Sequence, residues 1–121
     1  MNVIVYESMK PNQERLSTLI ESCGSIQTIE FFDSFKNLVS HLRQPSMTME
    51  IYILHPTDFE DLERLIALRN MFIDAKVILI LPDDEKEMVN QGHRLHPRYM
   101  CSQKGNWEIL RSIIQNLAKA G

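Results

Sequence analysis

Two residues that can do chemistry, Glu7 and His55, stand at the ends of apolar runs. The segment EIYILHP, residues 50 to 56, is a run of β-prone residues that stops at His55, and Glu7 follows the similar run VIVY. A histidine in such a place can accept phosphate beside a carboxylate, contact a metal or ligand, or hydrogen-bond its neighbours as a neutral group. We expect the third role, in which His55 bonds to Glu7 or to the backbone and leaves no buried charge unpaired.

Other polar residues follow the later apolar runs, and they make a weak case for a metal site. Asp83 and Asp84 follow the run VILIL, but capping of the next helix is the simpler role for both. Lys104 lies just beyond the last predicted strand, where a solvated surface lysine is the default. His93 and His96, with Cys101 nearby, lack the second thiolate and the regular spacing of a zinc site. We therefore predict no metal ion.

Length and composition favour a single compact domain over residues 1 to 121. A chain of 121 residues with 44% hydrophobic content suits one sizeable core. The net charge of −3, without a basic run, predicts no direct binding of nucleic acid. No apolar stretch approaches the roughly 20 residues of a membrane span. No signal peptide precedes the first strand, so we expect a cytoplasmic protein that does not enter a membrane.

Glycine and cysteine usage excludes further classes of protein. The chain has only 4 glycines and no glycine-rich loop after the first strand, so neither a nucleotide cofactor nor FMN is predicted. Cys23 and Cys101 lie far apart without C-x-x-C spacing, and we expect both to be reduced core thiols.

The elements that must position these residues alternate in hydrophobic period, which is typical of repeated βα units and a parallel sheet. The predicted strands are residues 3–6, 26–32, 51–54, 77–81 and 98–102. The first, third and fourth are apolar on both faces, as central parallel strands are. We therefore predict an α/β flavodoxin-like (βα)5 fold with strand order 2-1-3-4-5, whose ligand crevice lies at the carboxyl ends of strands 1 and 3.

Capping and stop signals bound the five predicted helices. Their starts are assigned to Pro11-Asn12, to Asp33-Ser34, to a capping box of Thr57 and Glu60, to Asp83-Asp84, and to Asn106. The first helix is predicted to end at Gly24 in the left-handed conformation, the second before Pro45, and the short fourth helix near Gly92.

At this point the chain resembles the receiver domain of bacterial response regulators, the CheY-like domains of two-component systems. NVIVYES is similar to the first strand of that family, SFKNLVSHL to its second helix, and WEILRSIIQNL to its fifth helix. The resemblance covers essentially the whole chain. It implies the same sheet order and a role in signal transduction through protein partners.

The functional positions of the family differ from this sequence. The acidic pair that ends strand 1 in receivers falls on Tyr6 and Glu7, and the phosphoaccepting aspartate falls on His55. The Ser/Thr position is Leu81, and the lysine followed by proline is replaced by Ser102 and Gln103. Of these positions, Glu7 alone keeps an acidic side chain. The resemblance is therefore to a degenerate receiver, or pseudo-receiver, that is neither phosphorylated nor an enzyme.

Two alternatives to a protein-interaction module remain open. In the first, a small ligand or anion binds at the rim of the sheet. The residues that would line that site are Glu7, Ser8, His55, Asp83, Ser102 and Lys104. In the second, His55 itself accepts phosphate as a relay.

The expected interaction face combines the fourth helix, the fifth strand and the fifth helix, which commonly carry dimer and target contacts in receiver domains. Alternation along the strand sends Tyr99 and Met100 to opposite sides, and the mixed aromatic and basic composition of this region favours binding to a partner or a second copy. The residues assigned to this face are Met88, His93, Arg98, Tyr99 and Met100. The alternative for Tyr99 is a side chain half covered by the fourth helix.

Overall fold

The structure is a computed structural model, and it describes residues 2–7, 13–24, 26, 28–44 and 50–120. The predicted helix start at Pro11 and Asn12 and the predicted stop at Pro45 lie outside these residues. Every described strand belongs to one parallel sheet of order β2-β1-β3-β4-β5, as the sequence predicts. The strands are β1 (Asn2–Glu7), β2 (Thr28–Phe32), β3 (Glu50–His55), β4 (Lys76–Leu81) and β5 (Tyr99–Ser102).

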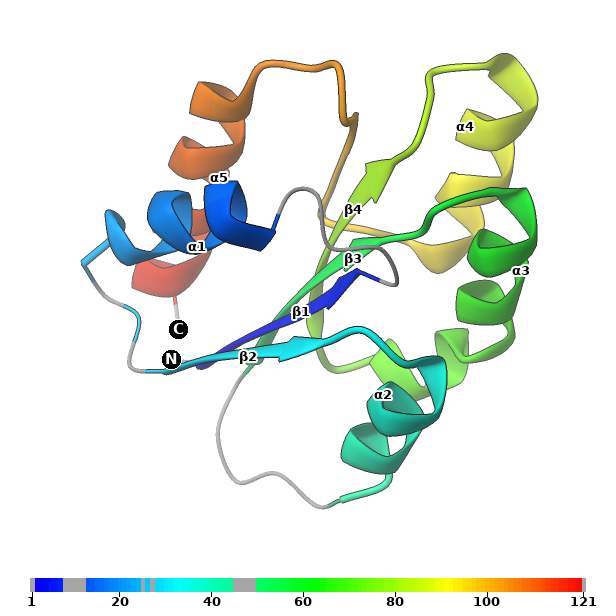
Figure 1. Ribbon diagram of the computed structural model, residues 1–121, viewed down its shortest axis with the longest axis horizontal. Helices are drawn as coiled ribbons and strands as arrows, with labels where there is room; N and C mark the ends of the chain where they lie inside the picture. The colour runs from blue at the N-terminus through cyan, green and yellow to red at the C-terminus, as the bar shows by residue number, and fades with distance from the viewer. Residues whose placement is uncertain (1, 8–12, 25, 27, 45–49, 121) are drawn as a thin grey trace.

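Helices cover both faces of the sheet. Figure 1 shows α1 and α5 on one side and α2, α3 and α4 on the other. The α-helices are α1 (Gln13–Glu21), α2 (Phe35–Leu42), α3 (Phe59–Ala67), α4 (Lys86–Gly92) and α5 (Trp107–Ala120). Two short 3₁₀ helices that were not predicted, η1 (Arg69–Phe72) and η2 (His93–Leu95), extend α3 and α4.

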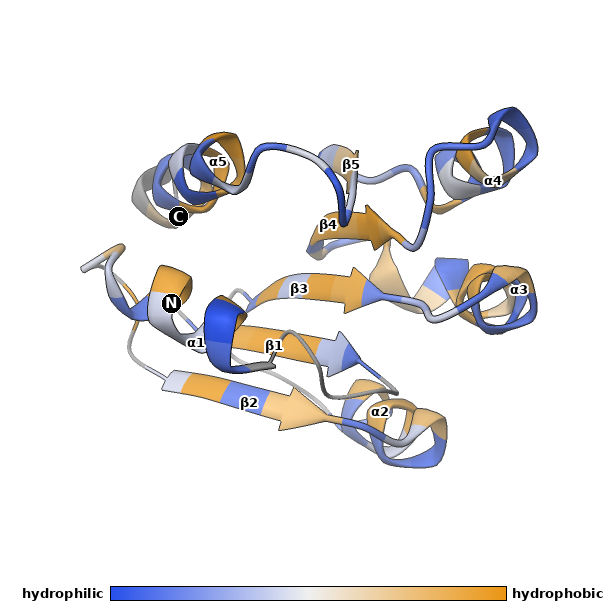
Figure 2. Ribbon diagram, turned by 45° about the horizontal axis from the view of Figure 1, so that its top comes forward, coloured by the Kyte–Doolittle hydropathy of each residue, from blue (hydrophilic) through white to orange (hydrophobic). Residues whose placement is uncertain are grey.

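The burial of the strands explains their order. β1, β3 and β4 are buried along almost their whole length, whereas β2 and β5 are half-buried at the two edges. Alternate side chains of the central strands enter two separate apolar clusters, one on each face, as strand geometry requires. Figure 2 shows the apolar colouring concentrated on the strands and on the inward sides of the helices.

The predicted caps are partly confirmed. The Ser34 side chain caps α2, and the Asn106 side chain accepts a hydrogen bond from the Glu108 backbone N–H at the start of α5 (2.9 Å). The Thr57–Glu60 capping box is wrong by one residue. Asp58 is the N-cap of α3, because its carboxylate accepts from the Asp61 backbone N–H at 2.8 Å.

The cap predicted at Asp83 and Asp84 is also wrong in detail. Helix α4 follows Glu85 as its N-cap residue and has no side-chain cap hydrogen bond. The Asp83 carboxylate instead accepts from the Glu85 backbone N–H (3.0 Å), which closes a local turn before the helix begins.

Gly24 and Gly92 play different roles at the ends of helices. Gly24 has φ of +73° and ends α1 in the left-handed conformation, as predicted. Gly92 keeps a helical φ of −58°, and the chain continues through η2 before it turns at His96 with φ of 52°. Gly92 is instead needed for close packing, since an added Cβ would lie 2.7 Å from Met100 Sδ and 3.1 Å from Leu79 Cδ2.

A buried lysine that the sequence did not indicate anchors the last helix. β4 begins at Lys76, one residue before the predicted strand, and this side chain is 5% exposed. Its ammonium group donates a hydrogen bond to the Leu117 carbonyl oxygen in the last turns of α5 (2.8 Å). A cation at this end of a helix also interacts favourably with the helix dipole.

Among the described residues, no helix combines the length and the apolar content that crossing a membrane would require.

We predict that Gly92→Ala destabilises the protein. The added methyl group gains roughly 1 kcal/mol in helix propensity, but overpacking against Met100 and Leu79 costs roughly 1–3 kcal/mol. A net loss of about 1 kcal/mol in the free energy of unfolding is expected from urea denaturation. Asn90→Ala, on the exposed side of α4, is the matched control and should not lose stability; a more stable Gly92→Ala variant would contradict the packing argument.

Candidate functional site

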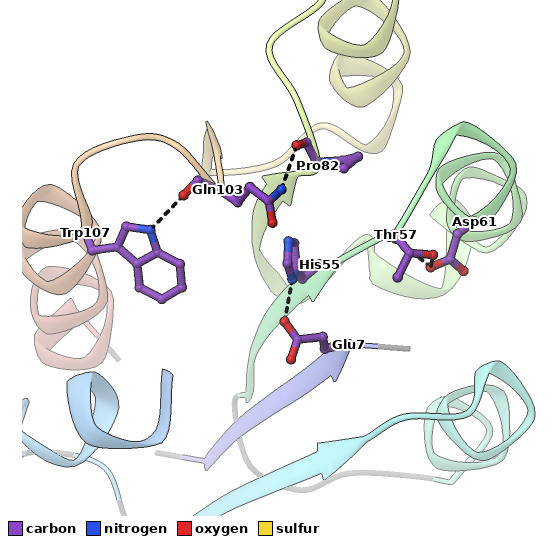
Figure 3. A network of polar contacts seen from close by, with 7 residues as sticks. All are labelled: Glu7, His55, Thr57, Asp61, Pro82, Gln103 and Trp107. Carbon is purple, nitrogen blue, oxygen red and sulfur yellow. Dashed lines mark hydrogen bonds and ion pairs between the residues drawn. The ribbon is translucent and has the colours of Figure 1, made fainter. Parts of the chain in front are cut away.

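The parallel register of β1 and β3 brings Glu7 and His55 together at the carboxyl end of the sheet. These residues are direct partners in the register, and His55 Nδ1 lies 2.6 Å from Glu7 Oε2. The carboxylate can only accept, so Nδ1 is the donor in this hydrogen bond. The side chains are almost completely buried, with Glu7 4% and His55 5% exposed. Figure 3 shows the pair between the ends of the two strands.

The other polar atoms of this pair are buried without a partner. Neither His55 Nε2 nor Glu7 Oε1 has a hydrogen-bond partner in the part of the chain that the structure describes. Such atoms cost free energy when buried, and they often mark a functional position or the place of a water molecule. In a neutral ring whose proton is on Nδ1, the other nitrogen, Nε2, carries a lone pair and can accept a hydrogen bond. Nε2 is the atom that faces away from Glu7.

Gln103 lies on the side of the His55 ring opposite Glu7 (Figure 3) and is held at three points. Its backbone N–H donates to the Leu81 carbonyl (2.9 Å), and its side-chain amide donates to the Pro82 carbonyl (3.1 Å). The Gln103 carbonyl accepts from Trp107 Nε1 (3.2 Å). This residue therefore ties the ends of β4 and β5 to the start of α5, beyond the position where receivers carry a lysine.

Tyr6 and Leu81 serve the core rather than a phosphorylation site. The Tyr6 hydroxyl donates to Asp61 Oδ1 (2.8 Å), and both side chains are buried. The other carboxylate oxygen of Asp61 accepts from the Thr57 backbone N–H (3.0 Å). Tyr6 thus links β1 to the first turn of α3. Leu81 is 1% exposed in the apolar cluster below α3 and α4.

The remaining residues assigned to the rim do not join the Glu7–His55 pair. Ser102 is half-buried, and Lys104 is exposed in the turn that follows β5. Asp83 is half-buried and bonded to the Glu85 backbone, while Ser8 lies outside the described residues. Across the described ranges, no three side chains of His, Cys, Asp or Glu gather as a metal ion would require.

Both cysteines have the properties of core thiols. Cys23 is buried and Cys101 half-buried, and neither is in a disulfide. Burial raises the pKa of the Cys101 thiol to about 11 and raises the pKa of Cys23 as well. Because the thiolate is the nucleophilic form, neither thiol is activated for chemistry.

Several polar contacts were not predicted from the sequence. Asp61 was not predicted to have a structural role, although an acidic residue three positions after Asp58 is a capping signal. His41 Nε2 lies 3.2 Å from Glu50 Oε2, and the Tyr52 hydroxyl donates to Glu50 Oε1 (3.0 Å). Burial, followed by the charge of Glu50, raises the pKa of Tyr52. The spacing of Glu50 and Tyr52 places both on one face of β3, but the approach of His41 depends on how α2 packs on the sheet.

The expected interaction face is only partly exposed. Met88 is 7% exposed and packs in the core, so its assignment to this face is wrong. Met100 also packs against that core, beneath α4. Tyr99 is half-buried, and it packs on the α5 side of the sheet rather than under α4. His93 and Arg98 are exposed.

Ile109, an apolar residue that was not assigned to the interaction face from the sequence, extends it. Ile109 on α5 is 48% exposed. Helical geometry places Ile109 and the half-buried Ile113 on the same side of α5, away from α1. The interaction face is defined below as His93, Arg98, Tyr99, Ile109 and Ile113.

Solved structures identify the fold. A response regulator receiver protein from Pseudoalteromonas atlantica aligns with a TM-score of 0.77 and 16% identity, over 99% of this chain and 98% of the other. A two-component response regulator from Legionella pneumophila aligns with a TM-score of 0.77 and 12% identity, over 100% and 99%. A putative pilus assembly protein from Burkholderia thailandensis aligns with a TM-score of 0.74 and 12% identity, over 100% and 99%.

These alignments show that the chain has the flavodoxin-like fold of CheY-like receiver domains along nearly its whole length. No protein-family profile matches the sequence, and no curated protein matches it significantly. The chain therefore shares the architecture of receivers at identities of 12 to 17% among the aligned structures.

We predict that His55→Asp lowers the free energy of unfolding by about 3 kcal/mol, because it places two carboxylates side by side in a buried position. Protonation of either carboxyl group relieves the repulsion, so the loss should shrink as the pH falls from 7 to 5. Added Mg²⁺ should recover part of it. Urea denaturation with His55→Asn as the neutral control tests this; a His55→Asp variant that is as stable as the wild type without metal contradicts the described pair.

Proposed function

We propose that this chain is a pseudo-receiver, a cytoplasmic protein-interaction module of a bacterial two-component or related regulatory assembly that works without phosphorylation. The observation that carries the proposal is the buried Glu7–His55 hydrogen bond of 2.6 Å. It occupies the strand ends where the resemblance to receivers would place an acidic metal-binding pair and a phosphoaccepting aspartate.

The carboxyl ends of the strands supply few of the groups that phosphoryl transfer requires. Mg²⁺ prefers hard oxygen ligands and usually binds through one or two carboxylates together with phosphate oxygens. Glu7 is the one carboxylate that the strand ends supply in the described structure, and its Oε2 is already bonded to His55. Leu81 and Ser102 end β4 and β5, so neither of these two positions supplies a cation that could stabilise a phosphoryl group. These features support a module that does no catalysis.

The interaction face supports binding to a protein. It combines an exposed isoleucine, Ile109, with the half-buried Tyr99 and the exposed Arg98. Aromatic residues and arginine are enriched at protein interfaces, and exposed apolar side chains favour partner binding. The partner is either another protein of the assembly or a second copy of this chain.

The ligand-sensor and relay alternatives have less support. A ligand at the rim would need to reach Glu7 and His55, whose free polar atoms are buried. Phosphate transfer to His55 would use Nε2, since Nδ1 is bonded to Glu7, and Nε2 is among the buried atoms. Either alternative requires the rim to open.

We predict that the protein gains no phosphoryl group from acetyl phosphate in the presence of Mg²⁺, because the rim lacks the acceptor aspartate and the lysine. Beryllofluoride should leave its amide NMR spectrum unchanged for the same reason. Intact-mass spectrometry measures the first outcome, with a receiver that retains the complete aspartate site as the positive control. A stable mass gain that disappears in His55→Asn would overturn the proposal in favour of a relay.

We predict that Arg98→Glu and Ile109→Ser each weaken self-association or capture of a partner by about tenfold, which corresponds to the loss of one well-placed contact. Sedimentation velocity and pull-down experiments measure the two outcomes. Ile73→Ser is the matched control, since Ile73 is 74% exposed, follows η1 and does not belong to the interaction face. Tyr99→Ala provides a further test once its fold is verified. If Arg98→Glu and Ile109→Ser bind like the wild type, the interface lies elsewhere.

A further inference from the structure

A groove between α1 and α5 lies apart from the Glu7–His55 pair and from the interaction face. Its volume is about 650 Å³, within the range of small-molecule sites. It is referred to below as the α1–α5 groove. The residues on which the argument rests are Glu14, Arg15 and Ser22 of α1 and its end, and Trp107, Glu108 and Arg111 of α5.

Both arginines of the groove are held in place by neutral partners. The Arg15 guanidinium lies over the Trp107 ring, 3.8 Å from its centroid, and Arg111 Nε donates to the Ser22 hydroxyl oxygen (2.8 Å). An arginine side chain at a protein surface is usually mobile, and binding a ligand to it costs conformational entropy. Because both guanidinium groups of this groove are already held in place, that cost is smaller here.

Neither arginine is neutralised within the described structure. Glu14 and Glu108 line the same groove, yet no ion pair within 4 Å joins them to Arg15 or Arg111 among the described residues. Arg111 Nε is bound to Ser22, which leaves its two terminal amino groups for an oxyanion. The outer face of the Arg15 guanidinium, away from Trp107, can stack on a planar ring.

The shape of the groove and its mixed charge restrict the ligand. Two concave surfaces of this kind do not fit each other, so a second copy docked groove to groove is disfavoured. The carboxylates of Glu14 and Glu108 reduce attraction for a bare inorganic anion, but they can accept hydrogen bonds from ring N–H groups. A ligand that combines a planar ring with one acidic group uses both arginines.

We propose that the α1–α5 groove binds small aromatic anions, in which a planar ring stacks on Arg15 while a phosphate or carboxylate group bonds to Arg111. The proposal does not depend on the proposed function, because neither Arg15 nor Arg111 belongs to the rim or to the interaction face.

Trp107 provides a direct reporter, since it is the only tryptophan in the chain. Its fluorescence and its indole Nε1–H resonance are to be followed during titration of the whole protein with GMP, guanosine, inorganic phosphate and 4-hydroxybenzoate at constant ionic strength. GMP tests the phosphate source and 4-hydroxybenzoate tests the carboxylate source of the anion. We expect at least one of these two to shift the Trp107 signals saturably, and to bind at least tenfold more tightly than guanosine or phosphate.

The variants Arg15→Met and Arg111→Met should each weaken that binding by about tenfold, which is the effect of losing one stacking or charge-assisted contact. Arg94→Gln is the matched control, because Arg94 lies on η2 and donates to the Gln91 side chain of α4; this variant should bind within twofold of the wild type. Dispersed amide spectra verify that each variant is folded.

Three results would overturn the proposal. The first is the absence of any Trp107 shift with millimolar GMP and 4-hydroxybenzoate. The second is equal binding of guanosine or of inorganic phosphate, which would make either the charge or the ring dispensable. The third is unchanged affinity in both folded arginine variants, which would place the binding outside the groove.

Discussion

The parallel pairing of β1 with β3 is the constraint on which the rest of the rim depends. It sets Glu7 directly opposite His55 and places Tyr6 where its hydroxyl reaches Asp61 at the start of α3. A shift of one residue in either strand would turn these side chains to the opposite face of the sheet. The apolar side chains of the two buried central strands prevent that shift, so the core fixes the geometry of the polar rim.

The fold was predictable because it depends on residue types and local period. The runs VIVY, IYIL and VILIL indicate central strands, and the more polar second and fifth strands indicate edges, which together specify the observed order. Ser34, Asn106 and Gly24 carry local signals that tertiary contacts do not override. The cap of α3 was misplaced because Thr57 and Asp58 both have capping side chains, and the sequence alone does not decide between neighbours.

The sequence predicted the part of the site that lies at the ends of the strands. The pairing of Glu7 with His55 was expected as one of two partners for the histidine, and the structure selects it. Three other features depend on the directions in which side chains point from different elements. These are the hydrogen bonds by which Gln103 links β4, β5 and α5, the burial of Met88, and the stacking of Arg15 on Trp107. Hydrophobic period carries no information about such directions when the partners are separated by tens of residues.

Helix α5 contributes to the groove with one side and to the interaction face with the other, so its attachment to the sheet matters to both. The Lys76 ammonium that holds its last turns is buried and bonded to a carbonyl oxygen, where dissolved ions screen poorly. Ion pairs at a protein surface weaken as salt is added. We therefore expect the attachment of α5 through Lys76 to respond little to ionic strength. A salt dependence of binding at either surface would then report on the ligand contacts themselves.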